Sequence, residues 1–264
     1  MHDVPLNQAV GLLGLAAPEA PQLLAVVAHG DARSEQPLLW QLSSALSDMG
    51  YGVTVLDATE NESVHNPGLQ QVLDYAFGHS PMEDAGPAWN VLPAGLGMQS
   101  LCSLGSKPAL SLQRLGQAFQ THGVLVLYAG VDCLVKLLPD SDIRPLLSVS
   151  NGKSSLLTSY LALKRLLRKA RVEPTILNMM QDAAAGRGAG AAGVAHALSE
   201  CARTFLSYEV NAIRIDPSQP ELQFSAEMRR LATRLLENAL VLRGSAPTDS
   251  GFDIPGFKEM SRSH

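Results

Sequence analysis

Residues 23–59 constrain the fold more than any other part of this chain. The stretch starts with an apolar run over 23–28, continues through a polar turn into a helical pattern, and ends in a second apolar run that stops at Asp57. Two apolar runs separated by one helix are typical of parallel strands joined by a crossover helix. In such a βαβ unit the first turn usually holds a ligand phosphate, because amides at the start of the helix point outward and the helix dipole favours an anion.

The helix of this unit is predicted from an apolar stripe whose members recur at spacings of three and four: Leu38, Leu39, Leu42, Leu46 and Met49. Ser34 is the predicted N-cap, Pro37 is placed near the first turn, where its missing N–H is tolerated, and Gly50 ends the helix. The following strand is apolar over 53–56, as expected for a strand covered on both faces of a parallel sheet.

From Gln41 the chain reads QLSSALSDMGYGVTVLDA, which resembles the opening of the MinD/ParA group of deviant Walker ATPases, where KGGVGKTT is followed by NLAxALAxxGxxVLLLDAD. Asp57 matches the first acid of that group's DAD motif, and Thr59 replaces the second. Counting back from Gln41, the group's loop positions fall on residues of different chemistry: Gly30 for the signature lysine, Asp31 and Ala32 for two glycines, Glu35 for the phosphate-binding lysine and Gln36 for the Mg²⁺-binding threonine.

The resemblance continues in WNVLPAGLG over 89–97 and implies a doubly wound, mainly parallel α/β sheet with helices on both faces. An apolar content of 46% in 264 residues is ample for a large buried core. We expect an N-terminal helical segment over 1–22, the α/β domain over 23–243 and a polar tail over 244–264. Further elements are predicted as helices over 68–77, 111–119, 194–206 and 225–242, strands over 122–130, 143–150, 175–180 and 210–215, and loops over 98–110 and 188–193.

The chemistry of the first turn argues against ATP hydrolysis. A phosphate cradle needs glycines that let amides approach the oxygens, and a cation against the β/γ charge. Asp31 and Glu35 would instead repel a triphosphate. The Walker B acid falls on Leu127 or Tyr128, neither of which holds Mg²⁺ through a carboxylate. The sequence therefore predicts a pseudo-ATPase with no catalytic residue and no metal site.

The resemblance leaves two vestigial nucleotide-site residues, Asp57 and Asn178, the latter in the place of an asparagine that contacts adenine in the group. Asn178 would equally well satisfy backbone groups at a strand end. Two other phosphate-binding patterns are incomplete. A P-loop around Lys153 needs a glycine at the position of Leu147. The Gly-rich run over 188–193 does not begin at the end of a first strand, as a dinucleotide-binding fingerprint does. An unusual ATP/Mg²⁺ switch that dimerises across the loop remains the alternative.

The N-terminal sequence NQAVGLLGL over 7–15 is predicted to be a short helix packed on the domain, or a partner-binding segment. It resembles the DQAxxLR segment of flagellar-number regulators of the FlhG/FleN type, which contacts an FlhF-like GTPase. That resemblance implies a non-catalytic regulator of flagellar number or placement, whose partner is such a GTPase or a flagellar basal-body component. An accessory role in cellulose or other exopolysaccharide secretion is the other pathway left open. The partner-binding residues implied are Asn7, Gln8, Ala9, Leu12 and Leu13.

The composition of the chain limits the functions and the cellular location that we expect for it. A net charge of −5 and a pI near 5.8 argue against general nucleic-acid binding. The sequence has neither an apolar run long enough to span a bilayer nor a basic leader, so we expect a cytoplasmic protein. The helix over 225–242 would cover the sheet or contact the inner membrane peripherally. Three cysteines, far apart in sequence and without a CxxC pair, are predicted to be buried thiols: Cys102, Cys133 and Cys201.

Overall fold

The computed structural model describes residues 20–75, 89–103, 107–119, 123–150, 153–179 and 190–243, and within them the chain forms an eight-stranded sheet. Seven strands are parallel, in the order β3-β2-β4-β1-β5-β6-β7, and β8 pairs antiparallel with the start of β1. The strands are β1 (Gln22–Ala28), β2 (Val53–Asp57), β3 (Trp89–Pro93), β4 (Val124–Gly130), β5 (Leu146–Val149), β6 (Thr175–Met179), β7 (Ala212–Ile215) and β8 (Leu240–Val241).

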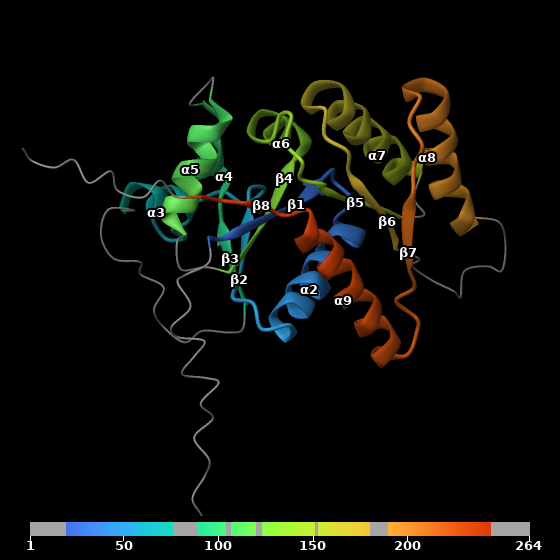
Figure 1. Ribbon diagram of the computed structural model, residues 1–264, viewed down its shortest axis with the longest axis horizontal. Coiled ribbons are helices and arrows are strands. Elements are labelled where there is room, and N and C mark those ends of the chain that lie inside the picture. Colours follow the sequence, from blue (N-terminus) through green and yellow to red (C-terminus); the bar gives the residue numbers. More distant parts are fainter. Residues whose placement is uncertain are drawn as a thin grey trace, which may run out of the picture.

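Helices cover both faces of this sheet, as Figure 1 shows, with α2 and α9 together on one side and α4 to α8 on the other. The predicted doubly wound, mainly parallel α/β fold is therefore confirmed. The helices are α2 (Ala32–Asp48), α3 (Leu69–Tyr75), α4 (Gly95–Ser103), α5 (Pro108–Ala118), α6 (Val131–Leu137), α7 (Lys153–Arg165), which runs into a π-helical turn (Leu166–Ala170), α8 (Gly190–Leu206) and α9 (Glu221–Glu237).

Each central strand contributes to two hydrophobic cores. In β1, Leu23, Ala25 and Val27 pack with the helices of one face, whereas Leu24 and Val26 pack with α2 and α9 on the other. Because both faces are buried, β1 needs apolar side chains at every position rather than at alternate ones. This requirement explains the unbroken apolar run that the sequence shows.

The predicted apolar stripe of α2 is buried, but the start of the helix differs from the prediction. Asp31, rather than Ser34, is the N-cap, and its side chain makes no capping hydrogen bond. Ser34 lies inside the first turn, where its Oγ donates to the Asp31 carbonyl (3.2 Å). Pro37 lies further into the helix than expected. The Glu35 side chain, in the first turn of the helix, instead reaches back and accepts from the backbone amides of Asp31, the N-cap, and of His29.

Two predicted loops contain helix. Residues 95–103 form α4, although 98–110 was expected to be loop, and α8 begins at Gly190 rather than after the Gly/Ala run. In α4 the glycines serve close packing, since a Cβ on Gly97 would lie 2.5 Å from a side-chain carbon of Leu69. Glycine therefore does not mark a loop here, because the neighbouring helix leaves no room for a side chain.

The C-terminal helix is also placed differently from the prediction. It spans Glu221–Glu237, and the chain then forms β8 instead of continuing as helix to Leu242. The Leu242 amide donates to the Pro21 carbonyl (2.9 Å), and its side chain is buried in the core on the face opposite α9. The predicted inward residues Met228, Leu231 and Leu235 are buried as expected.

The N-terminal segment and the C-terminal tail lie outside the described residues. The predicted partner-binding residues, Asn7, Gln8, Ala9, Leu12 and Leu13, are therefore not placed. Among the helices that are described, none combines the length and the apolar character needed to cross a membrane.

Candidate functional site

A polar cluster lies where the carboxyl ends of β1, β4 and β5 meet. Parallel strands bring their carboxyl ends to one edge of the sheet, and ligands of open α/β sheets usually bind there. The β1–α2 turn supplies His29 and Asp31, the first turn of α2 supplies Glu35, the end of β4 supplies Tyr128, and β5 with the start of α7 supplies hydroxyl groups. This edge is the predicted place of the first turn, so it is the candidate functional site.

The carboxylate of Glu35, in the first turn of α2, lies against the β1–α2 turn. The residue is fully buried, and its Oε1 accepts hydrogen bonds from the backbone amides of His29 (3.0 Å) and Asp31 (2.9 Å). Converging loop amides at the start of a helix form an anion-binding concavity, which in nucleotide-binding loops takes a phosphate. In this chain the protein's own carboxylate fills that concavity.

Tyr128 closes the other side of the carboxylate. Its hydroxyl donates to Glu35 Oε2, and the residue is only 7% exposed. Burial, followed by the hydrogen bond and the negative charge of Glu35, raises the pKa of Tyr128 far above its usual value, so the phenol keeps its proton at physiological pH. Tyr128, one of the two positions that the resemblance offers for the Walker B acid, is therefore a hydrogen-bond donor to Glu35.

His29 ties the turn to β5 and α7. Its Nε2 lies 2.9 Å from the Ser148 carbonyl oxygen and 3.3 Å from Glu35 Oε1, and its Nδ1 lies 2.9 Å from Thr158 Oγ1. A carbonyl oxygen only accepts, so Nε2 carries a hydrogen. The imidazole, whose side chain is 2% exposed, thus holds three elements around the buried carboxylate.

Asp31 is the second carboxylate of the turn and lies nearer the surface. Ser150 Oγ donates to its Oδ2 at 2.5 Å. Partial burial raises the pKa of Asp31, but hydrogen bonds from Ser150, Ser155 and Ser34 outweigh that effect and hold the pKa below its usual value. The charged form of Asp31 is therefore stabilised by the folded structure.

Replacing Asp31 with asparagine is expected to change the acid sensitivity of the protein. Because the folded state lowers this pKa from 3.8, the charged form stabilises the fold above about pH 3.8, and that contribution disappears as the pH falls through the lower, folded-state value. The difference in unfolding free energy between wild type and Asp31→Asn should therefore shrink below pH 3.8. Urea unfolding at several pH values measures it, and a difference that stays constant with pH would contradict the assignment.

The two predicted vestigial residues are far from each other. Asp57 ends β2, where its Oδ1 accepts hydrogen bonds from the backbone amide (2.8 Å) and hydroxyl (2.6 Å) of Thr59, and Asn178 is buried within β6. In the sheet order β4, β1 and β5 separate these strands, which corresponds to four steps, or about 19 Å. The structure brings Asp57 near Tyr128, its register partner, and leaves Asn178 on the other side of the Glu35 turn.

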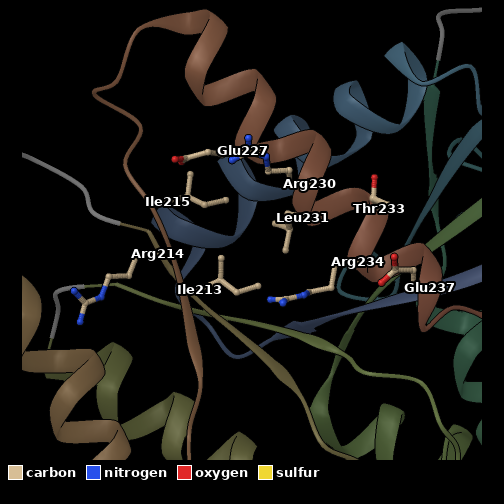
Figure 2. Close-up of a pocket in the computed structure, with 9 residues that line it drawn as sticks. All are labelled: Ile213, Arg214, Ile215, Glu227, Arg230, Leu231, Thr233, Arg234 and Glu237. Atoms are coloured by element: carbon tan, nitrogen blue, oxygen red, sulfur yellow. The ribbon is translucent and has the colours of Figure 1, made fainter.

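A groove of about 540 Å³ lies elsewhere, between β7 and α9 (Figure 2). Its apolar lining comes from Ile213, Ile215 and Leu231, and in Figure 2 the Arg234 side chain extends toward Ile213. Positive and negative side chains are mixed along it, so the lining selects no single class of ligand. The charged residues are Arg214, Arg230, Arg234, Glu227 and Glu237.

Comparisons with known proteins bear on the fold. No protein-family model and no curated protein matches the sequence. Among solved structures, the chain is similar to a plasmid partition protein from Borrelia burgdorferi (TM-score 0.54, 10% identity, covering 81% of this chain and 99% of that chain). It is also similar to a Cyanothece McdA variant in complex with ATP (TM-score 0.50, 13% identity, 83% and 94% covered). Cobyrinic acid a,c-diamide synthase from Mycobacterium smegmatis is a further match (TM-score 0.50, 14% identity, 82% and 94% covered).

The chain has the fold of these three solved structures. The fold implied by the sequence resemblance is thereby confirmed, and at 10–14% identity the likeness extends to the fold alone. Within this MinD/ParA-type fold, the turn between β1 and α2 is the one that carries Glu35.

Several residues of the cluster were not predicted from the sequence. From the sequence, Asp31 and Glu35 are predicted only to repel phosphate by their charge, and no role is predicted for His29 or for the serines around β5. Ser148 lies in β5 and Ser150 directly follows it, and this buried strand ends at the same sheet edge as β1; that pattern is the signal that could have pointed to the two serines.

Proposed function

We propose that this MinD/ParA-fold protein is a non-catalytic regulator that acts through protein contacts and not through ATP turnover. The observation that carries the proposal is the Glu35 carboxylate, which is bonded to two amides of the β1–α2 turn and to Tyr128. A bound phosphate would need those amides as hydrogen-bond donors. The carboxylate that already accepts from them would repel the phosphate.

The remaining chemistry of the turn supports the same proposal. Phosphoryl transfer relies on a lysine or arginine against the β/γ charge and on carboxylate-held Mg²⁺. At the positions that the resemblance assigns to those roles, the chain has Glu35 for the lysine and Leu127 or Tyr128 for the Walker B acid, and Tyr128 donates to Glu35 inside the protein. Asp57 bonds Thr59.

A phosphate-release assay with Mg-ATP tests the enzymatic side of the proposal. We expect no turnover above the background of a buffer control, with or without Asp57→Ala. Turnover by the native chain that disappears in Asp57→Ala would overturn the proposal and favour the ATP/Mg²⁺ switch.

For the pathway, we propose control of flagellar number or placement through the segment over 7–15, with an FlhF-like GTPase or a basal-body component as the partner. The support is the resemblance of that segment to the partner-binding segment of FlhG/FleN-type regulators. Deleting the gene should alter the number or position of flagella, and a chain carrying Gln8→Ala and Leu13→Ala should fail to restore them. Unchanged flagella together with a loss of exopolysaccharide would contradict this pathway and favour the secretion alternative.

A further inference from the structure

Two of the three cysteines meet on the face of the sheet opposite α2 and α9. Cys102 lies next to the end of α4, Cys133 lies in the first turn of α6, and their Sγ atoms are 3.5 Å apart although 31 residues separate them in sequence. Both thiols are free, and both residues are half-buried, whereas the sequence predicted buried thiols. Helix packing has therefore placed two reduced thiols in contact.

The environment makes one thiol of the pair the more reactive. A hydrogen bond with the Cys133 thiol lowers the pKa of Cys102 to about 7 despite partial burial, and the positive charge of Lys136 adds to this effect. The same hydrogen bond, together with burial, raises the pKa of Cys133. Since the thiolate is the nucleophile, Cys102 is the group that attacks and Cys133 is the group that follows.

We propose that Cys102 and Cys133 are a peroxide-sensitive pair that closes into a reversible disulfide between α4 and α6. The Cys102 thiolate attacks one oxygen of a hydroperoxide, the O–O bond breaks, and a sulfenic acid forms with release of hydroxide or alkoxide. The Cys133 sulfur then attacks the Cys102 sulfur and expels the sulfenic hydroxyl as water. Two thiols are oxidised by two electrons, the peroxide is reduced by two electrons, and a dithiol reverses the reaction.

The disulfide would join two parts of the domain that noncovalent contacts now connect. α4 is tied to the loop after β2, because the Gly97 amide donates to Glu62 Oε1 (2.8 Å). α6 starts directly after β4, the strand that carries Tyr128. Oxidation would therefore fix the loop after β2 and the end of β4 to each other, and closing a loop of this length raises resistance to unfolding.

Peptide mapping of the peroxide-treated full chain tests the proposal. Stoichiometric hydrogen peroxide at pH 7 should lower the mass of the monomer by about 2 Da, the loss of two hydrogens, and should yield a linked peptide containing Cys102 and Cys133. Dithiothreitol should restore the original mass. The oxidised chain should unfold at a higher urea concentration than the reduced chain.

Single substitutions separate this pair from the third cysteine, Cys201 in α8. Cys201→Ser should react like wild type. Cys102→Ser should lose the crosslink and consume peroxide about tenfold more slowly, because the variant lacks the thiol whose pKa the structure lowers to about 7. Cys133→Ser should accumulate the sulfenic acid of Cys102, which dimedone traps. The proposal is overturned if the wild-type map shows no link between Cys102 and Cys133 after peroxide treatment. This test uses the wild-type chain alone, so it does not require any variant to fold.

Discussion

Replacing Glu35 by alanine is expected to lower the free energy of unfolding by about 3–5 kcal/mol, because each donor that loses its acceptor costs about 1–3 kcal/mol. The carboxylate accepts from the part-buried amides of His29 and Asp31 and from the buried Tyr128 hydroxyl, so the substitution leaves these three donors without their acceptor. Urea unfolding followed by circular dichroism measures the change.

Two variants calibrate this result. Asp132→Ala removes an acid that pairs with Arg165 at 3.0 Å with both side chains largely exposed, and it should change stability by about 0–1 kcal/mol. Glu35→Gln keeps the shape of the side chain but replaces one acceptor oxygen by a donor. Its effect on the free energy of unfolding should therefore lie between those of Asp132→Ala and Glu35→Ala. A loss below about 1 kcal/mol in Glu35→Ala would mean that the turn does not depend on the carboxylate.

Replacing Tyr128 by phenylalanine is expected to lower the free energy of unfolding by about 1.5–3 kcal/mol, because the substitution removes a hydrogen bond to a charged group and keeps the ring. The ring packs in the core between the sheet and α2, so its retention isolates the contribution of the hydroxyl. The same unfolding experiment measures the loss.

A double-mutant cycle tests whether Tyr128 acts through Glu35. Once Glu35 is alanine, the tyrosine hydroxyl has lost its acceptor, and Tyr128→Phe should then change stability by less than about 0.5 kcal/mol. Additive effects of the two substitutions would contradict a direct bond between the side chains.

The free energy expected for loss of the Glu35 hydrogen bonds also predicts how weakly a nucleotide would bind at this turn. A phosphate that took the amides of His29 and Asp31 would have to displace Glu35 from its buried position, at a cost of about 3–5 kcal/mol before any repulsion between the charges. Each 1.4 kcal/mol weakens binding about tenfold, so a site that would otherwise be micromolar becomes roughly millimolar. This magnitude is why we regard the turn as closed to ATP.

The fold was predictable because its signals are local. The apolar runs of β1 and β2, the latter interrupted by Thr54, and the stripe of α2 follow from burial on both faces of a parallel sheet. The structure buries most of these residues, and Ala28 and Met49 are partly buried. The misplaced elements depend on distant contacts instead. Position 97 of α4 is glycine because Leu69 packs so closely that no side chain fits there. Residues 240–241 end the helical pattern because they pair with the start of β1.

The candidate site was predictable only in part. The two carboxylates of the first turn and the absence of a lysine there are visible in the sequence. The role of Glu35 is not, because its partner Tyr128 is 93 residues away and the amides that it accepts from are backbone groups. Repulsion of phosphate could be inferred from charge alone, whereas occupation of the anion position required the structure.

The most direct test of the account is a calorimetric titration of the native chain with Mg-ATP and Mg-ADP. A parallel titration of the double variant Glu35→Lys, Gln36→Thr, checked for folding by circular dichroism, shows whether removing the carboxylate opens the turn. We predict that native protein at micromolar concentration gives no heat of binding with either nucleotide. Micromolar binding by the native chain would contradict the central claim that Glu35 fills the anion position of this turn.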